Sequence, residues 1–180
     1  MDEKPVQRPR SLARRINGIV SACIVVFFLA HGLLGSISAI TGYRSSLIWL
    51  VWAGVACVVA HIVLSTITSR QQLTDTVRPP SDKKKRHLLL KWVSGCALAV
   101  LVIAHIVSMR MFGAEAVQSS ATGAALVIVL AIVLAVHLCL GAKSLLKDLG
   151  VDRRWRIAFR ITVCVVTAVI VVAELIALVI

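Results

Sequence analysis

Five long runs of apolar residues, separated by short polar stretches, dominate the pattern of the chain. The runs cover residues 16–41, 47–69, 91–112, 122–146 and 157–180. Each is long enough to cross the hydrocarbon core of a bilayer, which takes a helix about 20 residues. Helices satisfy all their backbone hydrogen bonds internally, as the membrane interior requires. The pattern therefore predicts an all-α integral membrane protein, with five transmembrane helices forming a single bundle over residues 1–180.

Composition agrees with this prediction, and the charge distribution adds an orientation. The chain is 59% hydrophobic and carries a net charge of +12. Of its 20 lysines and arginines, 18 lie before the first run, between the second and third, or around the fourth connection, which leaves Arg44 and Arg110 in the other two connections. Positive residues gather on the cytoplasmic side of membrane proteins. We therefore expect a cytoplasmic N-terminus, an outside C-terminus and a basic cytoplasmic loop over 70–90, and no binding of nucleic acid.

Four of the five histidines lie within apolar runs, one in each of the first four: His31, His61, His105 and His137. An ionisable side chain inside a membrane is costly and indicates a functional site. Each of the four lies about 15 residues from the start of its run, and successive runs cross the membrane in opposite directions. His31 and His105 are thus expected to share an outer level, and His61 and His137 an inner level, roughly 14 Å apart at the helical rise of 1.5 Å per residue.

Two histidines at one level can bind one haem iron from opposite sides, through neutral ring nitrogens. The sequence therefore predicts two haems b, an outer one held by His31 and His105 and an inner one held by His61 and His137. The alternative is that each histidine only forms a hydrogen bond to a neighbouring helix, as polar residues in membrane bundles do. The fifth histidine, His87, lies in the basic stretch, where a solvated or phosphate-facing side chain is expected.

Other residues add candidate roles to this picture. Small residues one or two turns from the histidines, such as Gly35, Gly54 and Gly141, leave room for a flat macrocycle. Cations near the membrane surfaces are candidate partners of haem propionates: Arg70, Lys91 and Lys143 inside, and Arg44 and Arg110 outside. Two glutamates, Glu174 in the last run and Glu115 in an outer loop, are candidates for a quinone or proton site, with a lipid-interface carboxylate as the alternative for Glu174.

Several function classes lack their motifs in this sequence. The five cysteines form no C-x-x-C pair, so zinc, iron–sulfur clusters and c-type haem find no support. There is no P-loop, no G-x-G-x-x-G fingerprint and no plausible hydrolytic triad. If the protein takes part in redox catalysis, the substrate chemistry is therefore expected in other subunits.

The histidine pattern resembles the single-chain dihaem cytochrome b that anchors succinate dehydrogenase and fumarate reductase complexes in the membrane. Two short motifs support the resemblance: His137-x3-Gly141-x-Lys143…Asp148, and the stretch Lys91-Trp92-Val93-Ser94-Gly95 at the start of the third run. The chain departs from the family in its short length, in Lys143 where arginine is common, and in having no carboxylate beside His137.

The resemblance implies an electron-transfer and anchor subunit in the bacterial plasma membrane. Its partners would be a cytoplasmic iron–sulfur subunit and a flavoprotein subunit, with menaquinone reacting in the membrane and a higher-order oligomer of the complex left open. Two alternatives remain. One is a dihaem b subunit of another quinone-linked oxidoreductase, and the other is a haem-free membrane transporter or assembly protein with structural histidines.

Overall fold

The computed structural model describes residues 12–42, 48–74, 79–152, 154–177 and 179, and these form six helices with no strand among them. The helices are α1 (Leu12–Thr41), α2 (Ile48–Leu73), α3 (Asp82–Phe112), α4 (Ala114–Gln118), α5 (Ala121–Leu149) and α6 (Trp155–Ala177). Within the described part, every helix except the short α4 is long and apolar enough to cross a membrane. The predicted all-α class is thus confirmed, as is the prediction of five helices long and apolar enough to cross a membrane.

The predicted basic loop over 70–90 is mostly helical. Helix α2 continues through Arg70 to Leu73, and α3 begins at Asp82, so that the run Lys83–Arg86 occupies its first turns. Lysine and arginine are good helix formers, and an acidic first residue is favourable at a helix N-terminus. Among the described residues of this stretch, Thr74 and Pro79–Ser81 lie outside the helices, and proline lacks the backbone donor that a helix interior needs. The helix boundaries therefore follow helix propensity where hydropathy predicts a loop.

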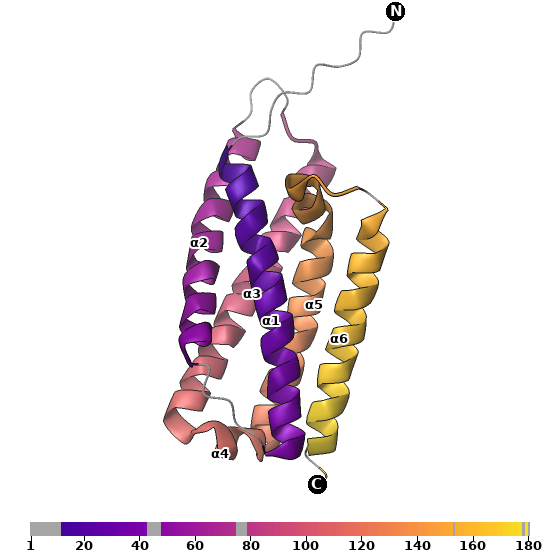
Figure 1. Ribbon diagram of the computed structural model, residues 1–180. Helices are drawn as coiled ribbons and strands as arrows, with labels where there is room; N and C mark the ends of the chain where they lie inside the picture. Colours follow the sequence, from indigo (N-terminus) through magenta and orange to yellow (C-terminus); the bar gives the residue numbers. More distant parts are fainter. Residues whose placement is uncertain (1–11, 43–47, 75–78, 153, 178, 180) are drawn as a thin grey trace, which may run out of the picture.

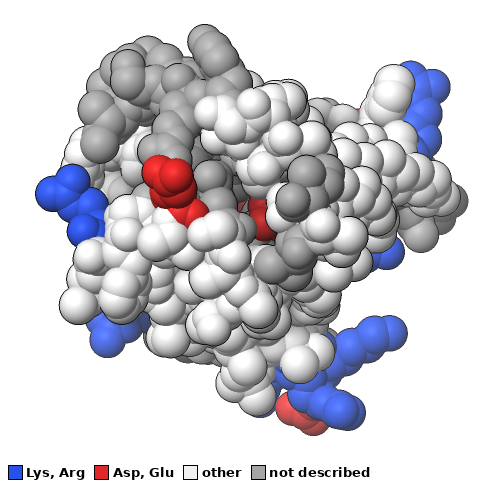
Figure 2. All heavy atoms as spheres, turned by 90° about the horizontal axis from the view of Figure 1, so that it is seen from below, with Lys and Arg blue, Asp and Glu red and all other residues white. Residues whose placement is uncertain are grey.

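The five long helices run alternately up and down (Figure 1). Helices α1, α3 and α6 begin at the end where α2 and α5 finish, and we call this the basic end of the bundle; the opposite end is the far end. Of the lysines and arginines that the structure describes, all except Arg110 lie toward the basic end. Seen from the far end, the surface is mainly uncharged, with blue side chains around its outline (Figure 2).

Helix α5 lies at the centre of the bundle and packs against α1, α3 and α6. The core cluster of buried residues comes from three of these helices: Val25 of α1, Leu134 and Leu138 of α5, and Val163 of α6. Helix α2 packs mainly against α1, and α3 packs mainly against α5. The bundle therefore has a tightly packed side formed by α1, α5 and α6. Helix α2 lies against α1 of this side, and α3 lies against α5. This arrangement decides which histidines can meet.

Candidate functional site

The structure brings the four membrane histidines together in two pairs. His31 of α1 lies within electrostatic range of His105 of α3, and His61 of α2 within range of His137 of α5. These are the same pairs that equal depths in the membrane predict. Each pair joins a helix of the first hairpin, α1 or α2, to one of the second, α3 or α5.

The two pairs lie at different levels of the bundle. His61 and His137 each lie 12 residues before the end of their helix at the basic end. His31 lies 10 residues, and His105 seven residues, before the end of its helix at the far end. We call His61 and His137 the basic-end pair, and His31 and His105 the far-end pair.

Two polar side chains of α1 hold the ring of His61. Nδ1 of His61 lies 2.9 Å from Oγ of Ser21 and 3.0 Å from Oδ1 of Asn17. The hydroxyl of Ser21 donates its own hydrogen to the carbonyl of Asn17, at 2.6 Å. Both neighbours of Nδ1 therefore act as acceptors, and from this network we assign the ring proton to Nδ1. Nε2 keeps its lone pair, with Oγ of Ser65 at 3.3 Å as its longer contact.

His137 is held in the same way from α3. Its Nδ1 lies 2.9 Å from Oγ of Ser94, and Ser94 donates its hydroxyl hydrogen to the carbonyl of Lys91 at 3.1 Å. Ser94 is then the acceptor, so His137 also carries its proton on Nδ1 and a lone pair on Nε2. Next to Ser94, Gly95 lets the ring approach, since a Cβ at Gly95 would lie 3.2 Å from Cε1 of His137. An acceptor bonded to one ring nitrogen is what orients a histidine that binds metal through the other.

The histidines of the far-end pair have fewer hydrogen-bond partners than those of the basic-end pair. Nδ1 of His105 is buried and has no hydrogen-bond partner among the described residues. His31 stacks on Phe27 with ring centroids 5.9 Å apart and an interplanar angle of 5°. Buried polar atoms nearly always have a partner in a folded protein. The far-end pair thus differs from the basic-end pair, in which Nδ1 of both histidines has a hydrogen-bond acceptor.

Two glycines open space one turn beyond a histidine of each pair. A Cβ built on Gly35, four residues after His31, would meet no side chain and no other helix within 4 Å, and the same holds for Gly141, four residues after His137. By contrast, Gly54 lies against the ring of Phe27. Since residues four apart share one face of a helix, both open positions lie on the histidine side of α1 and α5.

Among the cations predicted for this site, Lys91 is the one that reaches the basic-end pair. Its ammonium group donates to Oγ of Ser144, and its charge acts on both His61 and His137. Lys143 is exposed and lies beside His87, because six residues separate it from His137 and turn it by about 240° around α5. The predicted role of Lys143 at the basic-end pair thus finds no contact in the structure.

Two of the remaining predicted cations lie within the described residues. Arg70 and Arg110 are exposed at opposite ends of the bundle, and Arg44 falls outside the described residues. The structure shows no contact that would place either described arginine at a histidine pair.

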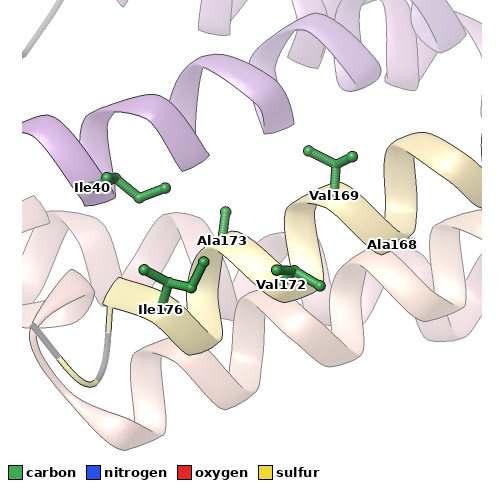
Figure 3. Close-up of a pocket in the computed structure, with 6 residues that line it drawn as sticks. All are labelled: Ile40, Ala168, Val169, Val172, Ala173 and Ile176. Carbon is green, nitrogen blue, oxygen red and sulfur yellow. The ribbon is translucent and has the colours of Figure 1, made fainter.

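The two candidate glutamates have different surroundings. Glu174 of α6 is only 5% exposed, whereas Glu115 of α4 is exposed. Ile170, one turn before Glu174, packs where a side chain on Gly32 would stand, next to His31. Glu174 therefore lies on the contact between α1 and α6, near the level of the far-end pair. An open groove of about 390 Å³ runs beside it, lined by carbon atoms of α6 residues such as Ala173 and of Ile40 (Figure 3).

Sequence reasoning missed Asn17 and Ser21, the two residues that hold His61. The signal was a polar pair four residues apart at the start of an apolar run, which places both side chains on one helix face. The role of such a pair can be assigned only when the helix that packs against it is known. Ser94, by contrast, belongs to a motif that the sequence already singles out.

The donor set fits the iron of a haem better than a bare metal ion. Within the described residues, no group of three or more histidine, cysteine or acidic side chains lies close enough to bind one ion. Structural zinc needs four protein ligands. A haem iron needs only axial ligands from the protein, and two imidazoles at one level supply them.

The helices and their composition indicate a multi-pass helical membrane protein, with two histidine pairs that each join different helices. Comparisons with models of protein families, with curated protein sequences and with solved structures find no match to this chain.

Proposed function

We propose that the protein is a dihaem cytochrome b, which carries electrons across the membrane between haems bound by His31 with His105 and by His61 with His137. The observation that carries the proposal is the geometry of the basic-end pair. Two histidines from different helices lie within electrostatic range of each other, and hydrogen-bond acceptors at both Nδ1 atoms favour the tautomer with its proton there. Both Nε2 atoms are then in the form that binds iron.

Different residues of the chain would bind the haem, orient its ligands and balance its charge. His31, His61, His105 and His137 would hold the haems, which would supply one-electron transfer. Asn17, Ser21 and Ser94 orient the ring nitrogens. Lys91 supplies positive charge next to the basic-end pair, where it balances acidic groups of a cofactor. The apolar helix faces around the site keep water away.

In a fuller form, we propose an anchor subunit of a succinate dehydrogenase or fumarate reductase type of complex, which relays electrons between menaquinone and a cytoplasmic iron–sulfur subunit. The motif around His137 and the lead-in around Ser94 support this assignment by resemblance. The exposed cations Lys83–Arg86 at the basic end provide a docking surface for a soluble partner. At the other end, the buried Glu174 near His31 is the candidate proton carrier of a quinone site.

The test is a spectrum of the purified full chain. Dithionite-reduced minus oxidised absorbance, with haem quantified as the pyridine haemochrome, should show two b-type haems per chain. Folded, monodisperse protein that contains no haem after expression with ample haem supply would reject the proposal. It would leave the histidines as links between helices, as in a haem-free transporter or assembly protein.

The hydroxyl of Ser94 offers a finer test of the basic-end site. We expect Ser94→Ala to weaken haem binding there by about 10- to 100-fold, because the hydrogen bond that orients His137 is lost. Ser94→Thr keeps a hydroxyl and should restore most of the affinity. Haem titration of the haem-depleted protein measures both. Ser36→Ala is the matched control, since Ser36 bonds only to the carbonyl of Gly32 in its own helix. Equal affinities for Ser94→Ala and Ser36→Ala would contradict the role of Ser94.

A further inference from the structure

Three helices bring polar side chains, two of them cations, to one short stretch of α5 near the basic end. Arg160 of α6 donates from Nη2 to the carbonyl of Cys139, at 3.3 Å. The ring of His87, on α3, lies near the carbonyl of the next residue, Leu140, and within electrostatic range of Lys143 and Arg160. The three side chains of His87, Lys143 and Arg160 therefore surround the same turn of α5 from outside the bundle.

This cluster is exposed and its charge is not balanced by the chain. All three side chains are exposed, and in the described part of the structure none of them forms a salt bridge with a carboxylate. The cluster also lies apart from the membrane histidines, because Lys143 is about 120° around α5 from His137. Its positive charge is therefore available to an anion from outside the bundle.

An apolar groove continues from the cluster along the membrane. On α5, Lys143 shares one face with Cys139, Val136 and Ile132, and on α6, Arg160 shares one face with Cys164 and Ala168. Between these two faces lies an open groove of about 380 Å³, lined by residues that include Ile132, Val136, Cys164 and Ala168. We call it the α5–α6 groove. The cations Lys143 and Arg160 stand at its end toward the basic end of the bundle.

The depth of the cluster matches that of lipid headgroups. His87 and Arg160 each lie five residues after the first residue of their helix, about 8 Å along the helix axis. Trp92 of α3 and Trp155 of α6 are exposed in the same region, as is typical of side chains at a membrane–water interface. A soluble acidic protein would meet the end of the bundle first, whereas a lipid beside the bundle meets the cluster and the groove together.

We propose that this surface binds an anionic phospholipid, with its phosphate held by Lys143, Arg160 and His87 and an acyl chain lying in the α5–α6 groove. Charge complementarity selects the headgroup, and the groove selects a ligand with a hydrocarbon tail. A bound lipid of this kind would contact α3, α5 and α6 at once. The proposal is independent of haem, since none of its residues contacts a histidine pair.

The experiment counts lipids that stay bound to the purified full chain. The protein is exchanged into detergent with equal amounts of phosphatidylglycerol and phosphatidylcholine, and native mass spectrometry measures which of them is retained. Wild-type protein should retain phosphatidylglycerol in preference. The double variant Lys143→Gln/Arg160→Gln should bind it about 30-fold more weakly, at roughly fivefold for each cation near a lipid surface. Circular dichroism checks that the helices are unchanged.

Two further variants separate a specific site from general attraction. Lys83→Gln/Lys84→Gln removes the same charge at the same end of the bundle and should retain phosphatidylglycerol. Ala168→Trp fills the groove, leaves the cations intact and should lower lipid retention. Equal losses in the two double variants would overturn the proposal in favour of nonspecific attraction. Full retention of phosphatidylglycerol in Ala168→Trp would overturn the proposal in favour of a small-anion site. Binding of inorganic phosphate as tight as that of phosphatidylglycerol would do the same.

Discussion

Replacing His61 or His137 with alanine is expected to lower the haem content from two per chain to one. Each substitution removes one of the two axial ligands of the basic-end site and leaves the far-end pair, His31 and His105, unchanged. A haem held by a single imidazole loses its bis-histidine spectrum and dissociates readily. The measurement is the pyridine haemochrome per chain, together with a redox titration that resolves the two haem potentials. The same potential should disappear in both variants.

The matching substitutions His31→Ala and His105→Ala should remove the other potential and preserve the first. His87→Ala is the control, because His87 lies outside both pairs and should leave both haems in place. If one substitution in each pair abolished both haems equally, while the helical content stayed unchanged, the assignment of the four histidines to two separate haems would be wrong. Retention of both haems in all four variants would show that other residues bind them.

The second large effect is expected from filling the open space beside the histidines. We expect Gly141→Leu to exclude the basic-end haem and Gly35→Leu to exclude the far-end haem. A Cβ built at either glycine meets nothing from a neighbouring helix within 4 Å, so the first atom of the new side chain causes no clash in the protein. A haem beside the histidine would compete with the leucine for that room. Haem content per chain and the surviving potential measure the result.

The haem-free alternative predicts the opposite outcome for these two variants. A glycine inside a helix costs about 1 kcal/mol relative to alanine, so a larger residue in open space would leave an apoprotein equally or more stable. Ala125→Leu is the control for added bulk on α5, because Ala125 is exposed on that helix. Loss of haem in Gly141→Leu but not in Ala125→Leu would support the site. Unchanged haem in both would mean that no macrocycle lies beside Gly141.

Both predictions depend on two separate properties of each histidine: its depth along the helix axis and the direction in which its side chain points. The depth of each histidine follows from the sequence, because a helix advances 1.5 Å per residue wherever it lies in the bundle. The direction in which each side chain points depends on how the helix is turned and on which helix lies next to it. Lys143 illustrates the difference. The spacing of six residues already turns Lys143 away from His137 on α5, but only the packing of α3 against α5 decides that His87 lies near it.

The sequence by itself determined the class of protein, the number of membrane-spanning helices, the asymmetry of charge and the matching levels of the histidines. All four depend on composition and on distance along the chain, and both are local properties. Only the tertiary structure decided that Asn17 and Ser21 hold His61, that Ser94 holds His137, and that His87 and Arg160 meet on α5. These contacts join residues of different helices. Their formation depends on the rotation and neighbours of each helix, which the packing of the whole bundle sets.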